Sequence, residues 1–288
     1  MLAPSVSTKR TWKFCSKPFA RLLRDALHIL ERSVIYPWAA WRGWRPPPLG
    51  SVALRELDFD YGYDDEARLK KAVRLVALHT YVSLEGLASL WWQIRQLDTQ
   101  DVPGALVECG VRQGGASAMM AAAHLAWSVV PRRELHLFDS FSTWPEPTER
   151  DGQWGKDINA LWRAIERNPT YLGYPAADSR ELIVERVGYP EHLLRYHVGW
   201  FQETVWSAAS CLGPIALLRL DGDWYESTKV CLEALYPNVS RGGIVVIDDY
   251  GAFEGCRKAV DEFTATLQRP FFLHRIDFTG RYWIKHGV

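Results

Sequence analysis

The sequence contains no long apolar run, no paired cysteines and no excess charge of either sign, and each absence excludes a class of protein. Its longest uncharged stretch, residues 114–131, is too short for a comfortable membrane span and contains a histidine. The 34 lysines and arginines equal the 34 aspartates and glutamates, so overall charge does not favour nucleic acid as a partner. The five cysteines are scattered and form no CxxC pair, which is typical of thiols in a cytoplasmic protein. We therefore expect a cytoplasmic protein with no nucleic-acid partner and no stable membrane insertion.

Three short motifs are also missing. No GxGxxG fingerprint marks a dinucleotide fold, and no GxxxxGK loop marks a P-loop nucleotide site. The eight histidines show neither HxxH nor HExxH spacing, so a histidine-based metal site is not indicated. An NAD-dependent oxidoreductase is thereby disfavoured.

The pattern of apolar residues from position 102 onwards alternates between strands and helices, which predicts an α/β fold with a doubly wound, mostly parallel sheet. The predicted strands are residues 105–109, 134–139, 194–199, 215–220, 243–248, 271–276 and 282–286. The predicted helices are residues 66–97, 116–128, 157–165, 227–236 and 255–266. A short turn joins the last two strands, so we expect them to form an antiparallel hairpin.

The chain divides into three predicted parts. Residues 1–65 form an extension with a basic tail, an amphipathic helix over 18–35 and a linker rich in tryptophan and proline. Residues 66–100 form a helical lid segment, and residues 101–288 form the catalytic domain. The 14 tryptophans favour an aromatic pocket, a lipid-facing patch or an oligomer interface, and we expect a homo-oligomer.

Aspartates follow two of the predicted buried strands. Asp221 closes IALLRL, and Asp248 and Asp249 close GGIVVI. A strand can end in aspartate simply because a turn follows. However, carboxylates at neighbouring strand ends repel one another unless a cation lies between them, and an oxygen-only ligand set suits Mg²⁺. We therefore predict a Mg²⁺ site formed by these three residues.

A glycine-rich loop follows the first predicted strand, with the spacing E-x-G-x-x-x-G-G from Glu108 to Gly115. Its glycines let the backbone turn sharply and approach a ligand closely, and Glu108 suits a cationic group such as an amine. Asp139 ends the second strand, where a carboxylate can bind both hydroxyls of a ribose. This combination predicts a site for an adenosyl compound.

The chain resembles the macrocin O-methyltransferase family, the metal-dependent sugar O-methyltransferases of macrolide and aminocoumarin biosynthesis. The resemblance covers residues 72–288 and rests on the blocks LVECGVRQGGASAMMAA, LHLFDSFSTWPEPTERDG, HVGWFQETV, LRLDGDWYESTKVCLEALYP and GGIVVIDDYGAFEGCRKAVDEF. It implies a class I S-adenosylmethionine methyltransferase fold with a seven-stranded sheet, a bound Mg²⁺, and methyl transfer to a sugar hydroxyl of a glycosylated small molecule.

The resemblance also implies roles for single residues. The residues expected to bind S-adenosylmethionine are Ser83, Glu108, Gly110, Gly114, Asp139, Ser140 and Phe201. Asp221, Asp248 and Asp249 are expected to hold the metal. Asp223 is the expected general base, although the roles of Asp221 and Asp223 can be exchanged.

Two alternative functions are also compatible with the sequence, and two residues differ from the family pattern. The same metal chemistry suits a methyltransferase acting on a catechol-like or other vicinal diol, and a non-catalytic nucleoside-binding scaffold could share the fold. Glu146 and Glu149 are expected on a lid after the second strand, where they touch substrate or simply face solvent. Arg112 and Gln113 stand where family members often carry an aromatic residue and an arginine.

Overall fold

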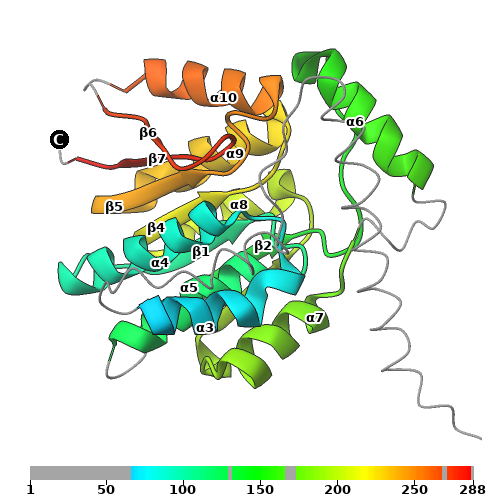
Figure 1. Cartoon of the computed structure of the whole chain (residues 1–288). Coiled ribbons are helices and arrows are strands. Elements are labelled where there is room, and N and C mark those ends of the chain that lie inside the picture. Colours follow the sequence, from blue (N-terminus) through cyan, green and yellow to red (C-terminus); the bar gives the residue numbers. More distant parts are fainter. Residues whose placement is uncertain (1–65, 129–131, 166–172, 268–270, 287–288) are drawn as a thin grey trace, which may run out of the picture. The chain divides into compact units, whose positions relative to one another are not determined.

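A seven-stranded sheet forms the centre of the computed structural model, which describes residues 66–128, 132–165, 173–267 and 271–286 (Figure 1). The strands are β1 (Ala105–Cys109), β2 (Leu135–Asp139), β3 (Leu194–Val198), β4 (Ile215–Leu220), β5 (Val239–Ile247), β6 (His274–Arg275) and β7 (Arg281–Ile284). Their spatial order is β3-β2-β1-β4-β5-β7-β6. Strands β1 to β5 pair in parallel, whereas β7 is antiparallel to both β5 and β6. The predicted fold class and the predicted C-terminal hairpin are confirmed.

Helices cover both faces of this sheet. The α-helices of the described residues are α3 (Glu66–Val76), α4 (Leu84–Thr99), α5 (Gly115–Trp127), α6 (Gly152–Ile165), α7 (Ala176–Arg180), α8 (Phe201–Leu212), α9 (Tyr225–Leu235) and α10 (Glu254–Ala265). One hydrophobic cluster joins α3, α4 and α5 to one face, and a second joins α8, α9 and α10 to the other (Figure 1). Along β1, Leu106 belongs to the first cluster and Val107 to the second, because successive side chains of a strand point to opposite faces. Covered on both sides, β1 and β4 are buried along their whole length.

The predicted helix over residues 66–97 is interrupted. It is divided into α3, a 3-10 turn at Ala77–His79, an extended segment, and α4. Thr80 is extended, and the hydroxyl of Ser83 accepts a hydrogen bond from the backbone N–H of Gly86 at 2.9 Å, which begins a new helix at Leu84. Ser83 therefore precedes a helix instead of lying within one.

The predicted secondary structure differs from the structure at two further places. The strand expected over 271–276 is limited to β6, and helix α8 was not predicted from the sequence. The amphipathic helix over 18–35 and the linker that follows it lie outside the described residues. In the part of the chain that the structure describes, no helix is long and apolar enough to cross a membrane.

Candidate active site

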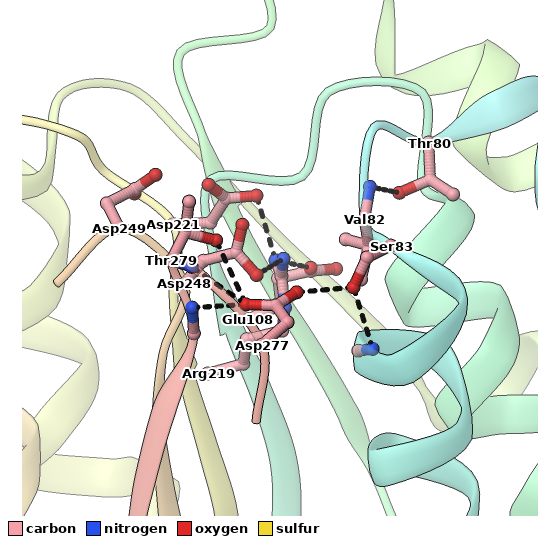
Figure 2. A network of polar contacts seen from close by, with 12 residues as sticks. Thr80, Val82, Ser83, Glu108, Arg219, Asp221, Asp248, Asp249, Asp277 and Thr279 are labelled. Carbon is pink, nitrogen blue, oxygen red and sulfur yellow. Dashed lines mark hydrogen bonds and ion pairs between the residues drawn. The ribbon is translucent and has the colours of Figure 1, made fainter. Parts of the chain in front are cut away.

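Acidic side chains from three strand ends converge on one arginine. Arg219 on β4 lies between Glu108 on β1 and Asp248, which follows β5 (Figure 2). Its Nη1 donates hydrogen bonds to Oε1 of Glu108 at 2.6 Å and to Oδ2 of Asp221 at 2.9 Å, and its Nη2 donates to Oδ1 of Asp248 at 2.6 Å. The side chains of Arg219 and Glu108 are each only 1% exposed. Arg219 thus links all three strand ends, a role that the sequence reading missed.

Sheet register explains this meeting. Glu108 and Arg219 are direct partners across the parallel pair β1–β4, so their side chains lie on the same face. The second oxygen of Glu108 accepts a hydrogen bond from Ser117 on α5. Burial raises the pKa of Glu108 to about 7, even though Arg219 and Ser117 both favour its charged form. The carboxylate is therefore held by two partners in a poorly solvated place.

A second group of carboxylates forms beside the arginine. Asp221, Asp223 and Asp249 each offer an oxygen, and these oxygens lie within 4.8 Å of one another. Oδ2 of Asp249 also accepts a hydrogen bond from the backbone N–H of Asp223 at 3.1 Å. Burial, followed by the neighbouring carboxylates, raises the pKa values of Asp223 and Asp249 well above the usual range. A bound cation would relieve this repulsion, so the donor set fits a hard divalent ion such as Mg²⁺.

The three predicted metal ligands differ in their partners. Asp221 and Asp249 lie in the carboxylate group, and Asp221 also pairs with Arg219. Asp248 pairs with Arg219 but is not part of this group, and burial raises its pKa to about 7. Asp223, the predicted base, lies among the ligand candidates. Its backbone has a left-handed φ of 58°.

The glycine loop between β1 and α5 packs tightly. Gly110 has a φ of 92°, and a Cβ there would lie 1.9 Å from the backbone oxygen of Asp221. Oδ2 of Asp139 accepts the backbone N–H groups of Val111 at 2.7 Å and of Arg112 at 3.1 Å. Asp139 therefore fixes the loop in this structure, and any contact with a ribose would come in addition.

Arg112 in this loop stacks on two tyrosine rings. Its guanidinium lies 3.8 Å from the ring centroid of Tyr81 and 4.8 Å from that of Tyr174. Such cation–π stacking orders a long side chain. Arg112, one of the two residues that depart from the family pattern, is therefore held in a defined position. Gly114 has a φ of 82°, and a Cβ there would lie 2.5 Å from Cβ of Ser179, so the loop also packs against the end of α7.

The other predicted cofactor residues lie around this edge of the sheet. The hydroxyl of Ser83 donates to Oδ2 of Asp277, which lies in the turn between β6 and β7 (Figure 2). Ser140 accepts the backbone N–H of Thr143 at 3.2 Å and thereby orders the turn after β2. Phe201 begins α8, and its ring lies near Gly222, where a Cβ would approach it to 3.2 Å.

The segment after β2 is fastened to the start of α9. The indole N–H of Trp224 donates to the backbone oxygen of Pro145 at 2.9 Å. Asp151, which is 1% exposed, accepts the backbone N–H of Tyr225 at 2.7 Å. Glu146 accepts a hydrogen bond from Asn159, whereas Glu149 is exposed and pairs with Lys156. Asp151 was missed, although the sequence TERD carries the signal of a capping box.

Comparisons with known proteins agree with this architecture. The family model described as macrocin-O-methyltransferase (TylF) matches residues 59–285. The chain is 37% identical over 207 residues, 71% of its length and 75% of the relative's, to 8-demethyl-8-(2,3-dimethoxy-alpha-L-rhamnosyl)-tetracenomycin-C 4'-O-methyltransferase of Streptomyces olivaceus. It is 34% identical over 78% of its length, and 82% of the relative's, to demethyldecarbamoylnovobiocin O-methyltransferase of Streptomyces niveus. The solved structure of the O-methyltransferase NovP superposes with a TM-score of 0.64 at 29% identity, covering 83% of this chain and 100% of that one.

Proposed function

This chain belongs to the macrocin-O-methyltransferase (TylF) family, and we propose that it methylates a sugar hydroxyl of a glycosylated small molecule with S-adenosylmethionine as donor and Mg²⁺ as cofactor. Membership makes the chain an O-methyltransferase, and its sheet has the class I methyltransferase order. The name of the Streptomyces olivaceus relative specifies a rhamnosyl group, which supports a sugar as the acceptor. The observation that carries the proposal is the carboxylate group Asp221, Asp223 and Asp249 beside the glycine loop.

The site has two halves, the side of the glycine loop and the carboxylate group, and each would have a separate task. Glu108 and Asp139 lie on the side of the glycine loop, where they would bind the amino group and the ribose hydroxyls of the donor. Asp221 and Asp249 would hold the ion, with Asp248 as the third ligand predicted from the sequence. When bound, a divalent cation lowers the pKa of a coordinated hydroxyl and orients it.

The chain's own chemistry is proton removal. Asp223, which lies with Asp221 and Asp249 in the carboxylate group, would take the proton of the acceptor hydroxyl. The hydroxyl oxygen then forms a bond to the methyl carbon while the bond from that carbon to sulfur breaks, which leaves S-adenosylhomocysteine. Alignment of the three atoms depends on both halves of the site being held rigidly.

A labelled methyl donor tests this function. Purified protein would be incubated with S-adenosylmethionine carrying a deuterated methyl group, Mg²⁺ and a panel of glycosides, each paired with its sugar-free aglycone. We expect mass spectrometry to find the labelled methyl group on the sugar of at least one glycoside and not on its aglycone. Labelling of catechols or of aglycones alone would assign the chain to the vicinal-diol alternative.

The cysteines support a cytoplasmic setting as part of the proposal. Cys109, Cys231 and Cys256 are buried free thiols, and Cys211 is an exposed one. Thiols of this kind persist in reducing compartments.

A further inference from the structure

Arg219 is a buried cation whose hydrogen bonds to side chains all end on carboxylates. Its guanidinium contacts Glu108 on the side of the glycine loop, and Asp221 and Asp248 on the side of the carboxylate group (Figure 2). Glu108 and Asp248 lie 111 and 29 residues away in sequence, so these two contacts depend on the assembled sheet. No task in the proposed reaction requires a cation at this place.

The geometry suits arginine in particular. The guanidinium is a planar fork with several N–H groups in fixed directions, and Nη1 and Nη2 divide three carboxylates between them at 2.6 to 2.9 Å. A lysine ammonium carries the same charge on one atom and cannot hold three separate strand ends in the same arrangement. Because β4 lies between β1 and β5, its side chain is the one that can reach both neighbours.

We propose that Arg219 is a positioning residue that fixes the carboxylates of both halves of the site, so that it determines the affinity for the methyl donor and for the divalent ion together. This inference rests on the proposed function. Through Glu108, Arg219 sets the carboxylate expected to receive the amino group of the donor. Through Asp221 and Asp248, it sets two of the carboxylates expected around the ion. Hydrogen-bonding partners of metal ligands act in this way, because they orient the ligating atoms.

Arg219→Lys tests the fork separately from the charge, and Arg133→Lys is its matched control. Arg133, which precedes β2, is also buried. It pairs with Asp98 of α4 at 2.7 Å and donates to the backbone oxygen of Gly104, which precedes β1, at 2.7 Å. Calorimetry would measure S-adenosylhomocysteine binding in excess chelator and, separately, Mg²⁺ binding without any cofactor. Each titration then reports one half of the site, at a temperature below the thermal transition of every variant.

We expect Arg219→Lys to weaken Mg²⁺ binding about 10- to 100-fold and S-adenosylhomocysteine binding about tenfold. Arg133→Lys should change both affinities less than about twofold even if it lowers the melting temperature, since it lies outside the site. Normal affinities in Arg219→Lys, or equal losses in Arg133→Lys, would overturn the inference. So would a loss confined to one of the two ligands.

Asp248→Asn covers the case in which Arg219→Lys does not fold. It keeps the size of the side chain but weakens the bond to Nη2, so we expect weaker S-adenosylhomocysteine binding in chelator although Asp248 lies on the metal side. Unchanged binding in this variant would count against the inference. Failure of the wild-type protein to bind S-adenosylhomocysteine would instead refute the proposed function, so the two failures are distinguishable.

Discussion

Ser83, the residue before α4, donates a hydrogen bond to Asp277 in the turn between β6 and β7, 194 residues further along the chain. The other oxygen of Asp277 accepts the backbone N–H groups of Thr279 at 2.9 Å and Gly280 at 2.6 Å. One aspartate therefore orders its own turn and ties that turn to the start of a helix on the other side of the site.

Ser83→Ala should destabilise the fold by about 1–2 kcal/mol, because it removes both the helix cap and the bond to Asp277. For a domain of this size, each kcal/mol corresponds to about 2–4 °C in melting temperature. Thermal unfolding followed by circular dichroism would measure the change. Ser210→Ala, at an exposed position of α8, is the control, and equal melting temperatures for the two variants would contradict the role of Ser83.

Asp249→Asn should abolish stabilisation by Mg²⁺. An ion that binds only the folded chain raises its melting temperature, and Asp249 is the most buried member of the carboxylate group. We expect the wild type to melt higher with Mg²⁺ than with chelator, and Asp249→Asn to show no difference. Asp101→Asn, an exposed change that precedes β1, should respond like the wild type. Full turnover of wild-type protein in excess chelator would refute the metal requirement itself.

Asp223→Asn should slow the chemical step by about 10²- to 10⁴-fold, the range expected for loss of a general base. Asparagine tolerates the left-handed backbone at this position, so the fold should be retained. Single-turnover mixing followed by rapid quench would measure the step, with S-adenosylhomocysteine affinity as the control. A normal rate in Asp223→Asn, together with an inactive Asp221→Asn that still binds Mg²⁺, would mean that the two roles are exchanged.

Asp139→Asn separates loop support from cofactor binding. The amide places a donor where a carboxylate oxygen now accepts N–H groups of Val111, Arg112 or Phe141, so we expect a loss of about 1–3 kcal/mol in stability. If Asp139 also binds the ribose, calorimetry should show weaker S-adenosylhomocysteine binding. A stability loss with unchanged affinity would leave Asp139 as a loop residue only.

Mild acid should destabilise the fold through His197. Its ring stacks on Phe138 with centroids 4.0 Å apart, and burial, aided by His136, lowers its pKa to about 4 from an ordinary 6.5. Between these two values the unfolded chain binds a proton that the folded chain rejects, so stability is complete above pH 6.5 and falls towards pH 4. Because the side chain is only half-buried, we expect a loss of about 1–2 kcal/mol and not the full amount implied by the shift.

Urea unfolding at pH 7.0 and 4.5 would measure this loss. His197→Phe keeps an aromatic ring on Phe138 and should reduce the difference between the two pH values. His192→Asn changes an exposed histidine near the same strand and should leave the difference intact. Equal pH dependence in both variants would exclude His197 as the cause.

The sheet could be predicted from the sequence, whereas the partners within the site could not. The runs IALLRL and GGIVVI read as buried strands because both faces are covered, and this local signal holds in the structure. Within IALLRL, however, Arg219 looks like a single polar interruption. Only the register with β1 shows that Glu108 is its direct neighbour.

Asp248 and Asp249 illustrate the same limit. The sequence predicts both as ligands of one ion, but it does not show which other side chains each of them contacts. The structure pairs Asp248 with Arg219 and places Asp249 beside Asp223. The sequence also does not reveal the interruption before α4. The apolar residues on both sides of Ser83 have a helical period, and a single residue caps the new helix.

The placement of β7 between β5 and β6 determines which edge of the parallel strands is covered. The edge of β5 that does not pair with β4 is covered by Arg281–Ile284, and Trp283 of this strand is fully buried. An unpaired apolar edge invites pairing with other chains. Strand β7 therefore protects this edge against aggregation, in addition to extending the sheet that carries Asp248 and Asp249.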